Sequence, residues 1–263
     1  MNVHGARSAR HAALIILLLS LFSAPGAATA LEDVIARNKP SIVAIGTFQR
    51  TRNPQFAFRG TGFIVGDGTL VATNAHVLPG QLDLEKLETI AVVIPATERD
   101  PLQRRDARAV VIDTDHDLAL LRIQGAALPP LAISGDAAVR DGQAAAFTGF
   151  PMGVVLGLIP VSHRATISAI TPVALPTSNA KQLDVKMIRR LQAGPFPVLQ
   201  LDATAYPGNS GSPLYDAQTG GVIGIINMVF VKSTKEAILS EPSGISFAVP
   251  AQYLQNLVTG LKE

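Results

Sequence analysis

Short apolar runs separated by turn-forming residues make up most of the chain after residue 40. The runs are rich in Val, Ile, Leu and Phe, and clusters of Gly, Pro, Asn and Asp stand between them. Runs of this length and composition are typical of β-strands. We therefore expect strands at residues 41–48, 60–65, 69–75, 89–94, 107–113 and 118–123, and again at 143–149, 161–170, 198–202, 220–228 and 245–249.

The strands fall into two similar halves, which predicts an all-β fold of two small barrels or sandwiches. A proline-containing stretch at 128–136 separates the halves, so we place one unit at 31–135 and the other at 136–263. Residues 31–38 and 250–261 have apolar positions at helical spacing, and each segment predicts a short terminal helix. We expect a long loop at 171–197, partly helical around 181–190.

The first thirty residues have the pattern of a secretory signal peptide. Arg7 and Arg10 precede an apolar run at 12–22, and Ala28-Thr29-Ala30 supplies the small residues of a cleavage site. The apolar run is short for a membrane span. We expect cleavage after Ala30, export to the periplasm or the exterior, and no stable membrane insertion of the mature chain. An uncleaved membrane anchor is the alternative.

Charge and cysteine content exclude several classes of function. Removing residues 1–30 removes two arginines and no acid, which leaves 20 basic and 20 acidic residues. This neutral mature chain has no dense basic cluster, so we do not expect it to bind nucleic acid. The absence of cysteine excludes thiol catalysis and thiolate metal sites.

We expect no cofactor and no metal. Residues 113–117 begin like a calcium-binding loop, which needs glycine at its sixth position and glutamate at its twelfth. Leu118 and Gln124 stand at those positions.

Three residues could together perform serine catalysis, which needs a hydroxyl nucleophile, a base and a group that orients the base. Ser210 lies in Pro207-Gly208-Asn209-Ser210-Gly211, His76 ends an apolar run, and Asp117 precedes the run 118–123. Each residue alone could be an ordinary turn or strand-end residue. Together they indicate more, because the mature chain has only two other histidines, at 116 and 163.

The motifs around these residues resemble those of the HtrA/DegP family of trypsin-like serine proteases. Gly60-Thr61-Gly62-Phe63-Ile64-Val65 is similar to the strand before the family's catalytic histidine, and Thr73-Asn74-Ala75-His76-Val77 is similar to the histidine motif. The aspartate motif, the nucleophile motif and the last strand are matched by Asp117-Leu118-Ala119-Leu120-Leu121, Gly208-Asn209-Ser210-Gly211 and Gly244-Ile245-Ser246-Phe247-Ala248-Val249-Pro250. The similarity runs from about residue 35 to the C-terminus, in the family's His, Asp, Ser order.

The resemblance implies two six-stranded antiparallel β-barrels, with short N- and C-terminal helices and an active site in the cleft between the barrels. The first barrel would supply His76 and Asp117, and the second would supply Ser210. The backbone N–H groups of Gly208 and Ser210 would form the oxyanion hole.

The chain also departs from the family's pattern. Ser212 stands where the family usually has glycine, and Tyr206 stands where asparagine is common. Neither change removes an atom of the Ser-His-Asp triad. Because the sequence ends at Glu263, we expect a protease domain alone, without the PDZ domain common in the family.

By the resemblance, the S1 pocket is expected near Thr204, Ile226, Asn227, Met228 and Ser246. None of these residues carries a charge, so we expect small or medium apolar P1 side chains in protein or peptide substrates. Two functions stay open: an exported serine endopeptidase, or a catalytically silent or latent protease-like protein that binds peptides. An ester substrate and a homo-oligomeric assembly are further alternatives.

Overall fold

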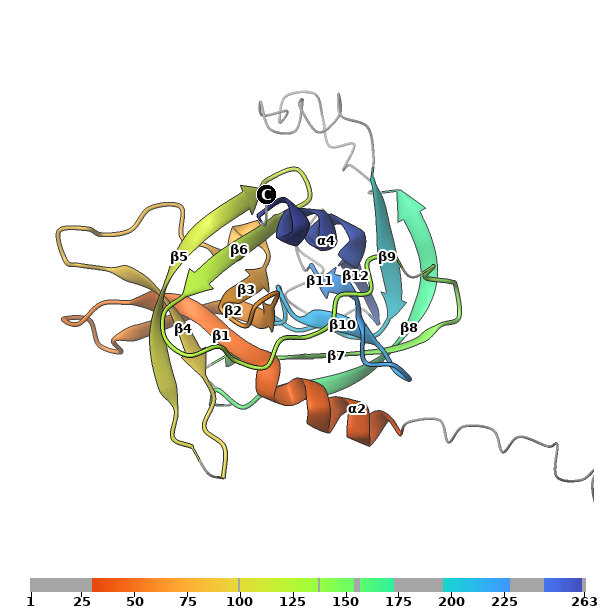
Figure 1. The fold of residues 1–263 in the computed structure, drawn as a ribbon, viewed down its shortest axis with the longest axis horizontal. Coiled ribbons are helices and arrows are strands. Elements are labelled where there is room, and N and C mark those ends of the chain that lie inside the picture. Colours follow the sequence, from red (N-terminus) through yellow and green to blue (C-terminus); the bar gives the residue numbers. More distant parts are fainter. Residues whose placement is uncertain are drawn as a thin grey trace, which may run out of the picture.

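The structure, a computed structural model, describes residues 30–98, 100–136, 138–153, 157–172, 196–227 and 244–261 of the 263-residue chain. The described residues form two closed antiparallel barrels of six strands each, which lie side by side (Figure 1). One helix precedes the first barrel and another follows the second. The expected all-β fold of two six-stranded barrels with short terminal helices is therefore confirmed.

The first barrel is closed in the strand order β1-β2-β3-β6-β5-β4. Side chains alternate between the two faces of a strand, and β1 buries both faces. Val43 and Ile45 point into the barrel, whereas Ile42 and Ala44 pack toward the second barrel. This double burial explains the continuous apolar run seen in the sequence. The strands are β1 (Ile42–Phe48), β2 (Phe56–Val65), β3 (Leu70–Thr73), β4 (Thr89–Ile94), β5 (Gln103–Asp113) and β6 (Leu118–Ile123).

The second barrel is closed in the order β10-β11-β12-β9-β8-β7. Its interior is filled by Phe147, Ile167, Leu201, Leu214 and other buried apolar side chains. The strands are β7 (Ala144–Gly149), β8 (Val161–Pro172), β9 (Pro197–Asp202), β10 (Pro213–Asp216), β11 (Val222–Ile226) and β12 (Ile245–Pro250).

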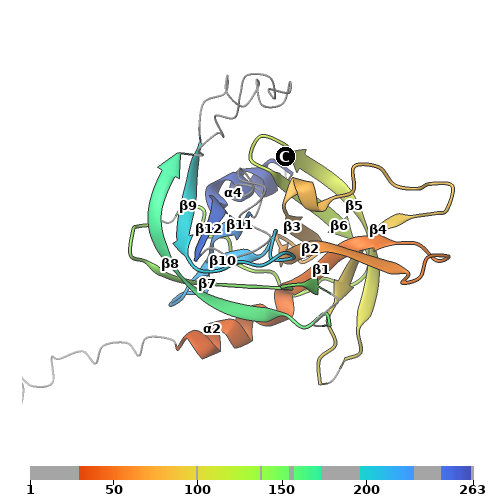
Figure 2. The same cartoon turned by 180° about the vertical axis from the view of Figure 1, so that it is seen from behind.

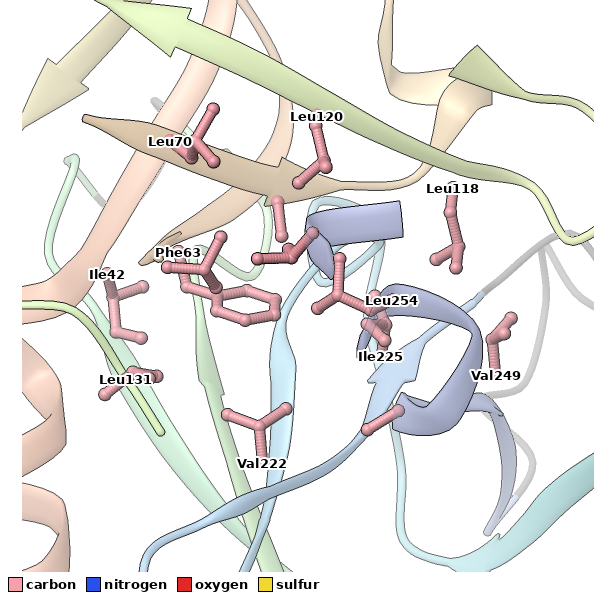
Figure 3. Packing of buried hydrophobic residues seen from close by; sticks show 14 of the residues in the cluster. Ile42, Phe63, Leu70, Leu118, Leu120, Leu131, Val222, Ile225, Val249 and Leu254 are labelled. Atoms are coloured by element: carbon pink, nitrogen blue, oxygen red, sulfur yellow. The ribbon is translucent and has the colours of Figure 1, made fainter. Parts of the chain in front are cut away.

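A hydrophobic seam joins the barrels and is covered by helix α4 (Ala251–Gly260). Leu118 and Leu120 from the first barrel, Ile225 and Val249 from the second, and Leu254 from α4 belong to one buried cluster (Figure 3). Burial of apolar surface contributes about 25 cal/mol per Å², so the seam fixes how the barrels face each other.

The N-terminal helix α2 (Leu31–Asn38) lies against the second barrel, as seen from behind in Figure 2. Val34 packs on Ala146 and Tyr215, and the Asn38 side chain donates a hydrogen bond to the Gly220 carbonyl oxygen at 2.9 Å. The 3₁₀ turn η1 (Lys39–Ser41) then leads directly into β1. The N-terminal segment thus connects both barrels.

In the described part of the chain, no helix is long and apolar enough to cross a membrane.

The structure corrects several sequence-based element limits. The strand expected at 60–65 begins earlier, because β2 starts at Phe56, which pairs with Phe48. Strand β10 was not predicted, because four residues directly after a turn motif show no periodicity. The predicted signal peptide, except Ala30, lies outside the described residues, and so do residues 173–195 of the loop predicted at 171–197. The ends of that predicted loop belong to strands, because β8 extends to Pro172 and β9 begins at Pro197.

Candidate active site

His76 and Asp117 meet where two paired strands of the first barrel end and begin. Strands β3 and β6 are antiparallel with Thr73 opposite Ala119, so the chain leaving β3 passes the chain entering β6. The Ala75 backbone N–H donates to the Asp117 carbonyl oxygen at 3.1 Å. Strand pairing therefore makes neighbours of two residues that are 41 positions apart in the sequence.

Both oxygens of the Asp117 carboxylate contact His76. Oδ1 accepts the backbone N–H of His76 at 2.9 Å, and Oδ2 lies 2.6 Å from the ring Nδ1. An ionised carboxylate only accepts hydrogen bonds, so the imidazole carries a proton on Nδ1. In the neutral ring Nε2 is then left with a lone pair that can accept a proton.

The local backbone around these two residues is unusual. His76 lies in the 3₁₀ turn η2 (Ala75–Val77) and not at the end of a strand as expected. Asp117 has a φ of 57°, a left-handed conformation that few non-glycine residues adopt. Its side chain is 9% exposed, compared with 31% for His76. The carboxylate is thus withdrawn from solvent while the imidazole reaches the surface.

Asn227 is the contact that the sequence did not reveal. Its fully buried side chain donates from Nδ2 to Asp117 Oδ2 at 2.7 Å. The Asn227 backbone N–H donates to Phe247 at 2.9 Å, which anchors the residue in the second barrel. A hydrogen bond across the seam therefore links the second barrel to the carboxylate that holds His76.

Backbone hydrogen bonds of Ser210 and Gly211 place Ser210 beside strand β2, near the η2 turn that carries His76. The Ser210 carbonyl oxygen accepts the Thr61 N–H at 2.9 Å, and the Gly211 N–H donates to Ile226 at 3.0 Å. A Cβ on Gly60 would lie 3.0 Å from the Ser210 carbonyl oxygen and 2.8 Å from a methyl of Val77. Ser210 and the residue after His76 therefore both lie against Gly60 of β2.

The Ser210 loop, residues 207–212, leaves two backbone N–H donors free. Among the described residues the N–H groups of Asn209, Gly211 and Ser212 all donate to carbonyl oxygens, whereas those of Gly208 and Ser210 donate to none. Gly208 has a φ of 101°, and a Cβ there would overlap the Phe150 carbonyl oxygen. Only glycine fits this backbone. The two free donors are those expected to form the oxyanion hole.

Residues 60–225 match the family model described as the trypsin-like peptidase domain. The chain belongs to the trypsin-like peptidase family. This match spans both barrels and includes His76, Asp117 and Ser210.

Curated relatives are named as HtrA/DegP-type serine proteases, which confirms the resemblance drawn from the motifs. The putative serine protease HhoA of Synechocystis is 31% identical over 86% of this chain and 51% of its own length. A probable periplasmic serine endoprotease DegP-like of Marinomonas is 30% identical over 77% of this chain and 35% of its own length. The chain thus spans between about a third and a half of these relatives. The crystal structure of Deg5 shares the fold, with a TM-score of 0.59 at 23% identity over 86% of this chain and 90% of that one.

The residues expected to line the S1 pocket of this trypsin-like domain differ in their burial and in their hydrogen-bond partners. Thr204 is half-buried, Ile226 belongs to the core of the second barrel, and Asn227 turns to Asp117. The Ser246 hydroxyl donates to the Ala203 carbonyl oxygen at 2.7 Å and accepts the Ala205 N–H at 2.9 Å. These two hydrogen bonds of Ser246 therefore fix the backbone of residues 203–205. Met228 lies outside the described residues.

Arg59 is a residue that the sequence analysis did not single out. From β2 its guanidinium donates through Nε to the Val77 carbonyl oxygen at 2.6 Å and through Nη2 to that of Leu78 at 3.0 Å. It thereby satisfies the carbonyl groups that end the η2 turn. No motif marks such a contact, because it depends on the pairing of distant segments.

Proposed function

We propose that the chain is an exported serine endopeptidase that hydrolyses peptide bonds with Ser210 as nucleophile, His76 as general base and Asp117 as the group that orients His76. The observation that carries this proposal is the contact of His76 Nδ1 with Asp117 Oδ2 at 2.6 Å, beside a serine loop with two free N–H groups. Membership of the trypsin-like family supports it.

The proposed chemistry begins with transfer of the Ser210 hydroxyl proton to His76 Nε2. The serine oxygen bonds to the substrate carbonyl carbon, and the displaced π electrons form an oxyanion that the N–H groups of Gly208 and Ser210 stabilise. The carbon–nitrogen bond then breaks, and His76 returns the proton to the leaving amine. Water cleaves the acyl-enzyme by the same two proton transfers, and the serine hydroxyl is restored.

The proposal extends to specificity and location. Thr204 and Ser246 are uncharged and stand at the expected S1 pocket, which supports small or medium apolar P1 side chains in protein or peptide substrates. The N-terminal sequence pattern and relatives named as periplasmic endoproteases support export.

The test is hydrolysis of casein and of a mixed peptide library by the purified protein, with Ser210→Ala and His76→Ala as inactive variants. Ser212→Ala is the matched control, because it removes a serine hydroxyl two residues from the nucleophile. We expect the first two variants to lose about three or more orders of magnitude in rate and the control to keep most activity.

Two outcomes would contradict parts of this proposal. Peptide binding without any cleavage would favour a catalytically silent or latent binding protein. A cleavage profile dominated by Arg or Lys at P1 would contradict the proposed apolar specificity, while leaving the proposed triad intact.

A further inference from the structure

The Ser210 loop, residues 207–212, is hydrogen-bonded to a residue of the first barrel. Thr61 of β2 is fully buried, and its hydroxyl donates to the Gly208 carbonyl oxygen at 2.7 Å. The same oxygen, Oγ1, accepts the Phe150 N–H at 3.0 Å. The Thr61 backbone N–H donates to the Ser210 carbonyl oxygen at 2.9 Å. One residue of the first barrel therefore binds the carbonyl groups on both sides of Asn209.

The three peptide planes from Pro207 to Ser210 differ in how they are fixed. In a trans peptide the C=O and the N–H of one plane point in opposite directions. In the first plane the Pro207 carbonyl oxygen accepts the Met152 N–H at 2.6 Å, so the Gly208 N–H points away from Met152. In the third plane the Asn209 carbonyl oxygen accepts the Ser212 N–H at 3.0 Å, and the Ser210 N–H is free.

The middle plane connects these two and is bound at both ends. Its N–H, from Asn209, donates to Tyr206 at 2.9 Å, and its carbonyl, from Gly208, accepts the Thr61 hydroxyl. Rotation of this plane would change the angle between the Gly208 and Ser210 N–H groups. The carbonyl end of the middle plane is held by the side chain of Thr61.

Threonine suits this task for two reasons. Its β-branched side chain restricts χ1, which fixes the direction of the hydroxyl. Its backbone is held as well, because the Thr61 carbonyl oxygen accepts the Thr73 hydroxyl at 2.7 Å. The hydroxyl is therefore a donor preorganised by the first barrel, and preorganised groups stabilise a transition state without reorganisation cost.

We propose that Thr61 is a positioning residue for oxyanion stabilisation: its hydroxyl sets the Gly208–Asn209 peptide plane and thereby aims the N–H groups of Gly208 and Ser210. This inference rests on the proposed function and deepens it. It assigns to the first barrel a part in transition-state binding, in addition to His76 and Asp117.

The test uses a fluorophosphonate probe, whose phosphoryl oxygen must occupy the oxyanion position when the serine oxygen attacks phosphorus and fluoride leaves. The second-order labelling rate is measured for the wild type, Thr61→Val, Thr61→Ala and Thr61→Ser. Removing one oxyanion donor outright costs about 100- to 1,000-fold. We expect loss of the Thr61 hydroxyl to slow labelling by about 10- to 100-fold, and Thr61→Ser to stay within about threefold of the wild type.

Thr148→Val is the matched control for a purely structural effect. Thr148 is also fully buried, and its hydroxyl lies 2.8 Å from those of Tyr215 and Ser162, within the second barrel. We expect it to lower the thermal unfolding midpoint as Thr61→Val does, but to leave the labelling rate near that of the wild type.

A folded Thr61→Val protein that labels as fast as Thr148→Val would overturn the inference. If Thr61→Val does not fold, Thr61→Ala decides: labelling by this folded variant at the wild-type rate would show that the hydroxyl does not aim the two N–H groups. A wild-type protein that is never labelled would contradict the proposed function itself, and this inference with it.

Discussion

At the scale of single residues, the Asp117 carboxylate accepts hydrogen bonds from both barrels. His76 donates from its backbone and from its ring, and Asn227 donates from its side chain. A hydrogen bond to a charged group contributes about 1.5–3 kcal/mol. The amide of Asn227 thus helps to hold the carboxylate in one orientation.

Replacing Asn227 by leucine should lower kcat/KM by about tenfold to a hundredfold, because the carboxylate loses a buried donor of that strength. Leucine is similar in size, so the cavity is small. The measurement is kcat/KM on a peptide substrate beside the unfolding midpoint of each protein. A folded Asn227→Leu variant with wild-type kcat/KM would show that His76 alone is enough to hold Asp117.

A second residue-scale prediction concerns pH. Hydrogen bonding to the Thr47 hydroxyl, the Asp83 N–H and Arg52 lowers the pKa of Glu88 from 4.5 to about 2. Because the folded pKa is below the unfolded one, the stabilisation from Glu88 is present above pH about 4.5 and lost as pH falls toward about 2. The unfolding free energies of wild type and Glu88→Gln should therefore differ most at neutral pH and converge near pH 2. A constant difference over this range would contradict the pKa assignment.

At the scale of elements, the η2 turn that carries His76 is held by contacts with neighbouring segments. It is three residues long, and Arg59 on the neighbouring strand β2 binds the carbonyl oxygens of Val77 and Leu78. The forked guanidinium holds both carbonyls at once, which a lysine ammonium on a flexible stem does less well. The position of His76 thus depends on a side chain from another element.

Arg59→Met should lower kcat by about threefold to tenfold, since it removes hydrogen bonds of about 1 kcal/mol each from the turn. Arg59→Lys should recover only part of this loss. Arg122→Met is the control, because among the described residues the Arg122 guanidinium bonds only to Thr69 and Asp67, at the turn before β3. Equal kcat values for Arg59→Met and Arg122→Met would contradict the positioning of His76 by Arg59.

At the scale of the whole molecule, the seam makes the two barrels one cooperative unit. Its buried cluster draws on both barrels and on α4, in addition to the separate core inside each barrel (Figure 3). The proposed active-site residues come from both barrels, so their relative positions depend on that packing. We therefore expect catalysis and global stability to depend on the same contacts.

Leu254→Ala in α4 should reduce the free energy of unfolding by about 2–5 kcal/mol, as expected for a fully buried leucine. We expect a single urea transition in the wild type and in the variant. Two transitions, of which Leu254→Ala shifts only one, would show that the barrels unfold independently.

The parts of the fold that depend on local pattern were accessible from the sequence. Strand β1 follows from a continuous apolar run and helix α4 from apolar periodicity, and the glycines beside Ser210 indicate a tight turn. Strand β10 was missed because it is short and begins with Pro213. The Asn227 and Arg59 contacts were missed because they are set by tertiary packing between segments far apart in the chain.

The most direct test of the account is the site of covalent modification by a fluorophosphonate, read by peptide mass spectrometry of the folded protein. We predict a single adduct on Ser210. It should not form when the protein is unfolded in urea before labelling, and it should form in much lower yield in His76→Ala. An adduct on another residue, or no adduct on the folded wild-type protein, would contradict the claim that Ser210, His76 and Asp117 form a working catalytic site.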